Sequence, residues 1–124
     1  MTQDPVVIVV DDETGSRESM AIAIEKSGLP VRTFDDAAEA LVFLEQCDSV
    51  RLAICDLRMP RVDGPAFYRA IAEFSPPQAR RVIFVTGDVT GTEAARFLDE
   101  SGCPWLAKPF RLVELLRVVR DIVG

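Results

Sequence analysis

Five short runs of apolar, largely β-branched residues alternate along this 124-residue chain with segments of helical periodicity. The first run, at residues 6–10, reads Val-Val-Ile-Val-Val and is apolar on both faces, as a central parallel strand is when helices cover both sides of a sheet. The other runs lie at residues 31–34, 52–55, 82–86 and 105–107. This alternation predicts an α/β fold of the (βα)5 type, and right-handed crossovers make it a doubly wound parallel sheet.

Glycine, proline and capping residues predict where the intervening helices begin and end. Gly28 and Gly102 stand where helix C-caps belong, and Pro76, followed by a second proline, is expected to close the third helix. Asp36 and Thr90 each precede a glutamate by three residues, which is the spacing of a capping box at a helix start. The chain contains no repeat and no linker, so residues 1–124 are expected to form a single domain.

The charge balance limits the classes of partner. Fourteen Lys and Arg against twenty Asp and Glu give a net charge of -6. Nucleic acids and anionic membranes both favour basic surfaces, so neither is expected as a direct partner. No apolar run approaches the roughly 18 residues of a membrane span, and the N-terminus lacks a basic, signal-like start. We therefore expect a cytoplasmic protein.

Two further features of the composition exclude familiar kinds of site. The chain has no histidine, which excludes Ser-His-Asp and Cys-His catalysis as well as imidazole metal ligands. Cys47, Cys55 and Cys103 are odd in number and lack C-x-x-C spacing, so a disulfide framework and a thiolate zinc site are both disfavoured. Buried or half-buried free thiols are expected instead.

The candidate site residues follow the predicted strands. Asp11 and Asp12 follow the first strand, Asp56 the third, Thr86 ends the fourth, and Lys108 follows the fifth. Ligands of doubly wound sheets bind beyond the carboxyl ends of the strands, so these side chains are expected to share one edge. Lys108 is one of only two lysines in the chain, which makes its place at a strand end less easily a matter of chance.

The carboxylates at this edge predict a cation site. Three close carboxylates repel one another, and an all-oxygen ligand set selects a hard ion such as Mg²⁺, or Mn²⁺. Asp11 and Asp12 could instead simply favour the first turn of the following helix, but that reading does not account for Asp56. Nucleotide and flavin sites are disfavoured, because the chain has neither a G-x-x-x-x-G-K-[ST] nor a G-x-G-x-x-G motif. A carboxylate nucleophile, a metal and a fixed lysine together suit phosphoryl transfer, with Asp56 as the nucleophile.

At this point the sequence resembles a known family, the receiver domain of two-component response regulators. The resemblance covers essentially the whole chain and rests on five motifs in order: Asp11-Asp12, Asp56-Leu57-Arg58-Met59-Pro60, Asp63-Gly64, Thr86-Gly87 and Lys108-Pro109-Phe110. It implies a flavodoxin-like strand order of 2-1-3-4-5. It also implies that Asp56 accepts a phosphoryl group from a phosphohistidine on a histidine kinase or a histidine phosphotransfer protein.

The resemblance also implies the roles of the neighbouring residues. Asp12, Asp56 and the backbone carbonyl of Arg58 would bind Mg²⁺, with Asp11 acting directly or through water. Lys108 would pair with Asp56 and then with the phosphoryl oxygens, and its bond to the following proline would be cis. Thr86 would turn its hydroxyl onto the phosphoryl group.

Three positions are expected to govern the response and its lifetime. Trp105 stands where the family places its switch aromatic, and it would swing inward behind Thr86, although it is bulkier than the usual Tyr or Phe. Arg58 and Asp88 resemble the family's tuners of dephosphorylation. If they pair over the site, they would impede the attacking water and lengthen the life of the phosphoryl group.

The function expected is that of an aspartyl-phosphate switch in a phosphorelay. It would phosphorylate itself from a donor, lose the phosphoryl group slowly, and signal to an unknown downstream protein through the surface of the fourth and fifth strand–helix units. It would act as a stand-alone regulator or as the receiver module of a hybrid kinase or longer regulator, monomeric or dimerising on phosphorylation. The alternatives are a metal-dependent phosphohydrolase, which lacks a D-x-D acid–base aspartate here, and an interaction module without phosphoryl chemistry.

Overall fold

The computed structural model describes residues 4–87 and 91–124, apart from the side chain of Thr92. It contains one five-stranded sheet in the order β2-β1-β3-β4-β5, with every neighbouring pair parallel. The predicted flavodoxin-like strand order 2-1-3-4-5 is therefore confirmed. The strands are β1 (Val7–Val10), β2 (Val31–Phe34), β3 (Leu52–Asp56), β4 (Val82–Thr86) and β5 (Trp105–Ala107).

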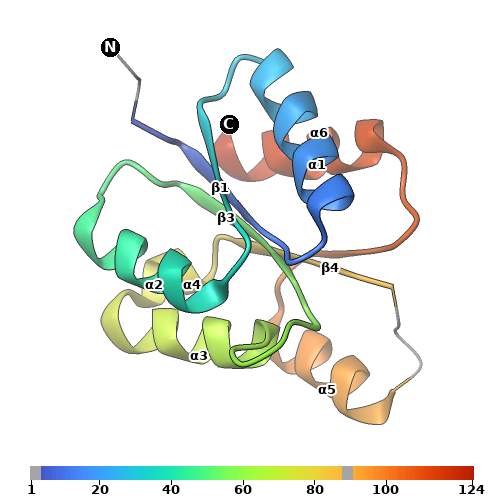
Figure 1. Cartoon of the computed structure of the whole chain (residues 1–124). Helices are drawn as coiled ribbons and strands as arrows, with labels where there is room; N and C mark the ends of the chain where they lie inside the picture. The colour runs from blue at the N-terminus through green and yellow to red at the C-terminus, as the bar shows by residue number, and fades with distance from the viewer. Residues whose placement is uncertain (1–3, 88–90) are drawn as a thin grey trace.

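Helices cover both faces of the sheet (Figure 1). Helices α1 (Thr14–Lys26) and α6 (Leu112–Val123) lie together on one face. The opposite face carries α2 (Ala37–Gln46), α3 (Gly64–Phe74), the short α4 (Pro76–Ala79) and α5 (Thr92–Ser101). Among the described residues, no helix is long and apolar enough to cross a membrane.

The all-apolar first strand explains why the sheet is covered on both sides. Residues 8 and 10 of β1 pack into one buried cluster, with the helices from α2 to α5, while residues 7 and 9 pack into the other, with α1 and α6. Side chains alternate across a strand, so a strand without polar residues needs a partner layer on each face. All of β1, β3 and β4 is buried as a result.

The strand predictions are confirmed with small differences. Strands β2, β4 and β5 have the expected bounds, β1 begins one residue later at Val7, and β3 extends one residue further, to Asp56. Gly102 is the C-cap of α5 with φ 67°, and Gly28 follows the C-cap of α1 with φ 103°, conformations that glycine adopts without a steric penalty.

Two local predictions need correction. The helix expected to close at Pro76 does end before it, at Phe74, but Pro76–Ala79 then forms the additional short helix α4, since proline is well suited to a first helical turn. The N-cap of α5 is Gly91, without a side-chain capping bond, in place of the expected Thr90. Thr90 itself lies outside the described residues.

Candidate functional site

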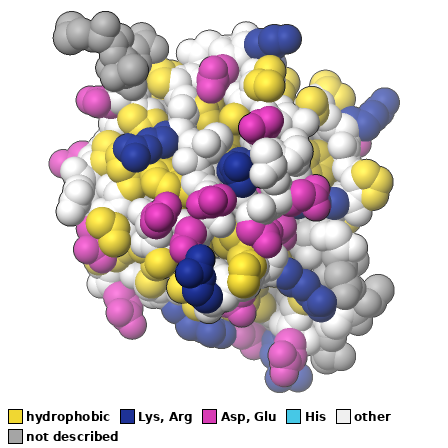
Figure 2. All heavy atoms as spheres, in the orientation of Figure 1, with side chains coloured by type: hydrophobic (Ala, Val, Ile, Leu, Met, Phe, Trp, Pro, Cys, Tyr) yellow, Lys and Arg dark blue, Asp and Glu magenta, His cyan; other side chains and the backbone are white. Residues whose placement is uncertain are grey.

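The sheet register brings the predicted residues to one edge. Asp11 follows β1 directly, Asp56 and Thr86 end β3 and β4, and Lys108 follows β5. Asp56 lies opposite Val85, and Thr86 opposite Ala107 in the adjacent strand. In Figure 2, acidic side chains gather across the middle of the face seen in Figure 1, with Lys or Arg side chains among them.

Three carboxylates form the centre of the site. Asp11, Asp12 and Asp56 each place an oxygen within 4.8 Å of the others. Asp11 is fully buried, Asp56 is 8% exposed, and Asp12 is exposed, so the cluster opens to solvent on one side. This donor set fits a hard divalent cation that keeps some of its water, because it consists of oxygen alone and is open on the side of Asp12. The structure therefore gathers the expected carboxylates into an arrangement that could hold Mg²⁺.

Lys108 follows β5, the outermost strand, and its side chain reaches this cluster. Its Nζ donates to Asp11 Oδ2 at 2.9 Å and to Asp56 Oδ2 at 3.2 Å. Its backbone N–H donates to the Thr86 carbonyl at 2.7 Å, and the Lys108–Pro109 bond is cis, as predicted. Burial lowers the pKa of Lys108, but the hydrogen bond to Asp11 and the two carboxylate charges outweigh it and raise that pKa overall. The ammonium is thus held in its charged form.

Asp56 is poised differently from an ordinary surface aspartate. Burial, together with the nearby charge of Asp11, raises the pKa of Asp56, while Lys108 and the Arg58 N–H, which donates to Oδ1 at 3.2 Å, act in the opposite direction. The ionised carboxylate is therefore short of compensating positive charge. A divalent cation beside Asp56 would supply that charge and favour the nucleophilic form.

The motif around Asp63 shapes the β3–α3 loop, residues 57–63. Asp63 is the N-cap of α3, and its Oδ1 accepts a hydrogen bond from Ala66 N at 3.0 Å. The N–H of Gly64 donates to the Leu57 carbonyl, and a Cβ at Gly64 would lie 2.8 Å from the Leu57 Cα. Only glycine allows this close approach, which folds the loop back beside Asp56.

The two predicted switch residues differ in burial. Thr86 is buried, whereas Trp105 is 43% exposed. Trp105 lies opposite Phe84 in the register and Ala107 opposite Thr86, so Trp105 and Thr86 share one face of the sheet. Trp105 therefore lies on the same face of the sheet as Thr86, but its side chain is partly exposed to solvent.

The three cysteines are free thiols, and Cys55 is the one beside the site. Cys55 is fully buried, its Sγ donates to the Asp56 carbonyl at 3.2 Å, and burial raises the pKa of this thiol well above its ordinary value. Cys103 is also buried, Cys47 is half-buried, and all three are free. The expectation of structural free thiols is confirmed.

Two arginines near the site were not predicted from the sequence. Arg17 Nη1 donates to the Asp11 carbonyl at 2.9 Å, and Arg61 pairs with Asp36 at 2.8 Å. Arg17 offered a signal, because it is a cation in the first turns of a helix, where acidic residues are favoured. The Arg61 contact joins residues 25 positions apart, and no local pattern marks it.

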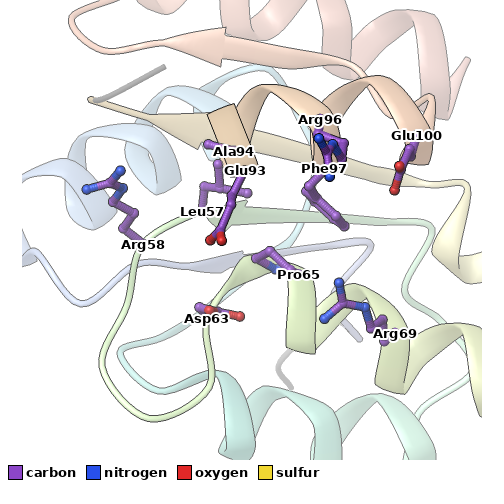
Figure 3. Close-up of a pocket in the computed structure, with 10 residues that line it drawn as sticks. All are labelled: Leu57, Arg58, Asp63, Pro65, Arg69, Glu93, Ala94, Arg96, Phe97 and Glu100. Atoms are coloured by element: carbon purple, nitrogen blue, oxygen red, sulfur yellow. The ribbon is translucent and has the colours of Figure 1, made fainter. Parts of the chain in front are cut away.

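A groove beside the site joins the β3–α3 loop to helix α5 (Figure 3). Its volume is about 490 Å³, and Leu57, Arg58 and Asp63 line it together with residues of α3 and α5. Arg58 reaches the start of α5, where its Nη2 lies 3.5 Å from the place a Cβ would take at Gly91. Asp88, the other predicted tuner, lies outside the described residues, so the expected pairing of the two side chains stays a prediction.

Curated relatives are similar to this chain over part of their own length. It is 32% identical over 120 residues to the C4-dicarboxylate transport transcriptional regulatory protein DctD of Rhizobium meliloti, covering 97% of this chain and 25% of that protein. It is 34% identical to the response regulator Rre1 of Synechocystis, covering 100% of this chain and 54% of that protein. For the sensor kinase CckA of Brucella abortus the identity is 28%, over 94% of this chain and 12% of the kinase. The chain thus spans about half of these relatives or less.

Solved structures match over nearly their whole length. A response regulator receiver protein from Pseudomonas putida superposes with a TM-score of 0.84 at 33% identity, covering 98% of this chain and 99% of that one. The chemotaxis protein CheY4 of Vibrio cholerae gives 0.83 at 26%, covering 97% and 99%. The sequence model described as the response regulator receiver domain matches residues 7–120. With its strand order and the acidic cluster at its carboxyl edge, this chain belongs to the response regulator receiver domain family.

Proposed function

We propose that this chain is the phosphoacceptor switch of a two-component phosphorelay, with Asp56 as the phosphorylated residue. The observation that carries the proposal is the position of the Asp56 carboxylate, which has an oxygen within 4.8 Å of Asp11 and Asp12 and lies 3.2 Å from the Lys108 ammonium. A nucleophile, an oxygen-lined cation site and a fixed lysine are the parts that phosphoryl transfer uses. The donor would be a phosphohistidine on a histidine kinase or histidine phosphotransfer protein.

In the transfer step, an Asp56 carboxylate oxygen attacks the phosphorus as the phosphorus–nitrogen bond to the donor histidine breaks. The product is an acyl phosphate on Asp56 and an unphosphorylated histidine on the partner. Lys108 would follow the phosphoryl oxygens and stabilise their charge, and the Thr86 hydroxyl would donate to one of them.

Asp12, Asp56 and the Arg58 carbonyl, with Asp11 directly or through water, are the groups that would hold Mg²⁺. Bound there, the cation would offset the charge that develops on the transferred group. Asp11 has a second task, since it also holds Lys108, and its Oδ1 accepts from the Glu13 N–H at 2.9 Å. This division of contacts supports Asp11 as the residue that holds Lys108 in place and Asp12 as the exposed metal ligand.

Loss of the phosphoryl group is proposed to be slow. The reach of the Arg58 side chain to the start of α5 supports a role for it above the site, where an attacking water would arrive. If Arg58 and Asp88 shield the phosphoryl group, Arg58→Ala should shorten its lifetime. Decay that is much faster in the wild type than in Arg58→Ala would overturn this shielding role.

The output is proposed to be a change in the surface formed by α5, β5 and α6, read by a downstream protein in the cytoplasm or by a second copy of the chain. Trp105 lies on that surface, and the groove described above joins α5, another part of the surface, to the loop beside Asp56. The greater length of the curated relatives supports a module of a longer regulator or hybrid kinase, and the match to nearly all of the CheY4 chain supports a stand-alone regulator.

The test is the intact mass after incubation with a small acyl phosphate and Mg²⁺. We expect one added phosphoryl group in the wild type, none in Asp56→Asn, and none when a chelator removes the metal. Asp63→Asn is the matched control, because asparagine keeps the N-cap of α3 and the charge change is the same. No gain in the wild type with several donors would favour the interaction module. Turnover of free phosphate esters would favour the phosphohydrolase.

A further inference from the structure

The tip of the β3–α3 loop holds a strained turn. Arg61 has φ 68°, the one positive φ of a non-glycine residue in the described part of the chain. The N–H of Val62 donates to the Pro60 carbonyl at 2.9 Å, so Arg61 is the central residue of a γ-turn with positive φ. This form of the turn is rare and strained for a residue with a side chain, and it persists only where neighbouring contacts hold it.

Asp36 supplies such a contact from another element. Arg61 Nη2 lies 2.8 Å from Asp36 Oδ2, while Asp36 Oδ1 accepts from Ala38 N at 2.7 Å as the N-cap of α2. The Asp36 side chain is 18% exposed and therefore largely fixed, whereas that of Arg61 is 77% exposed. Asp36 thus connects two elements: one carboxylate oxygen caps α2, and the other binds Arg61 in the loop.

The loop that Arg61 anchors also carries Arg58. Its first residues are tied to the site, since Leu57 N donates to the Val85 carbonyl at 2.9 Å and Arg58 N to Asp56 Oδ1. Its end is tied by Gly64 N, which donates to the Leu57 carbonyl. Between these ties the chain turns at Arg61, so the direction of the turn bears on where the Arg58 carbonyl lies.

We propose that the Arg61–Asp36 ion pair is a positioning contact for the metal site: it holds the turn at Arg61 and so fixes the path of the loop that carries the Arg58 carbonyl beside the carboxylate cluster. This rests on the proposed function, in which that carbonyl is a metal ligand. Groups that orient metal ligands contribute to metal affinity without touching the ion. An exposed ion pair contributes little to global stability, so its effect belongs in metal affinity and not in folding.

The experiment compares Mg²⁺ affinity by calorimetry in the full chain and four variants. Arg61→Gln removes the guanidinium but leaves a long side chain without a preference for positive φ, and Asp36→Asn keeps a good N-cap but removes the charge. Arg61→Lys keeps the cation. Arg51→Asn is the charge-matched control, because Arg51 is an exposed arginine that precedes β3 at the opposite edge of the sheet.

We expect Mg²⁺ affinity to fall about two- to fivefold in Arg61→Gln and Asp36→Asn, the range open to one exposed ion pair. The double variant should be no weaker than either single one, Arg61→Lys should retain part of the affinity, and Arg51→Asn should match the wild type. Urea midpoints should stay unchanged, and phosphoryl uptake from a small acyl phosphate should return to the wild-type rate at saturating Mg²⁺.

The outcomes separate this proposal from the proposed function. Wild-type chain that binds Mg²⁺ and gains a phosphoryl group, with Arg61→Gln and Asp36→Asn equal to it in affinity, would overturn the positioning role alone. Additive losses in the double variant would do the same, because independent effects are not one contact. Wild-type chain that neither binds Mg²⁺ nor gains mass would overturn both proposals.

Discussion

Strands β3 and β5 each deliver one half of the central ion pair, Asp56 from β3 and Lys108 from the residue after β5. Strand β3 pairs on both sides, and all five of its residues are buried. Strand β5 is last in the sheet order, has three residues, and exposes both of its ends. The carboxylate therefore stands on an enclosed strand, and its cation follows a partly exposed strand at the edge of the sheet.

This difference suits a switch that changes charge at one point and responds at another. A phosphoryl group added to Asp56 would bring new negative charge to a strand that cannot shift without disturbing two buried clusters. The compensating group, Lys108, belongs to an edge with few such constraints, and segments with little buried contact are the ones that open or move at low cost. Trp105 lies at the exposed beginning of the same short strand.

The largest expected effect tests whether the core of β3 contributes more to the free energy of unfolding than that of β5. Ile54→Ala, in the fully buried middle of β3, should lower the free energy of unfolding by about 2–5 kcal/mol. Leu106→Ala, in the middle of β5 and only half-buried, should cost about 1 kcal/mol. Urea unfolding followed by far-UV circular dichroism measures both. Equal losses would remove the distinction between the two strands.

The next effect separates the two tasks of Lys108. Lys108→Met removes a cation from beside Asp11 and Asp56, so Mg²⁺ affinity should rise severalfold, because like charges no longer compete. The rate of phosphoryl uptake should nevertheless fall about tenfold or more, because the charge developing on the phosphoryl oxygens loses a partner. Calorimetry gives the affinity, and the intact mass over time gives the rate.

The chain offers a matched control for this variant. Lys26, the only other lysine, is exposed in the last turn of α1, so Lys26→Met makes the same chemical change away from the site. It should leave both quantities at the wild-type value. A fall in Mg²⁺ affinity in Lys108→Met would show that the ammonium orders the carboxylates more than it repels the metal.

A smaller effect concerns the ionisation of Asp56. Burial raises its pKa in the folded state above the unfolded value of about 3.9. Ionising this group therefore lowers the free energy of unfolding as the pH rises towards and through the raised pKa. Without metal, Asp56→Asn should therefore be more stable than the wild type at pH 7, on the order of 1 kcal/mol. The gap should close as the pH falls towards the unfolded-state pKa.

Urea unfolding in a chelator at pH 7 and near pH 4 measures this gap. Lys108 does not alter its sign, since a raised lysine pKa contributes stability that is present throughout this range and is lost only at alkaline pH. Mg²⁺ at pH 7 should stabilise the wild type and leave Asp56→Asn nearly unaffected. A gap that stays constant between the two pH values would assign the effect to packing instead of ionisation.

The sequence predicted the framework because its signals are local and repeated. Runs of β-branched residues give the strands to within one residue, and parallel strands oblige Asp11, Asp56 and Lys108 to meet at one edge. The cis bond at Pro109 followed from the family resemblance and is present. These features depend on residue type and order, which the sequence displays directly.

Side-chain contacts between distant segments could not be predicted in the same way. Lys108 was expected to pair with Asp56, yet its shorter contact is with Asp11, because strand geometry and burial decide which carboxylate it reaches. The Arg61–Asp36 pair depends on an unusual φ at Arg61, and arginine itself carries no preference for that conformation. Helix α4 was missed because Pro76 fits equally well after one helix or at the start of the next.

The smallest expected effect returns to the edge strand. Trp105 is the only tryptophan in the chain, so its fluorescence reports on β5 without further labelling. If it turns inward when Asp56 is phosphorylated, its emission should shift to shorter wavelength and its quenching by acrylamide should fall, both reversing as the phosphoryl group is lost. Its bulk limits the rotation, so the change should be small. The Trp105→Phe, Phe84→Trp double variant is the control and should show no change, since the buried Phe84 position is already shielded. An unchanged Trp105 spectrum with full phosphorylation by mass would show that the exposed edge does not carry the response, and that the enclosed and open strands differ in stability alone.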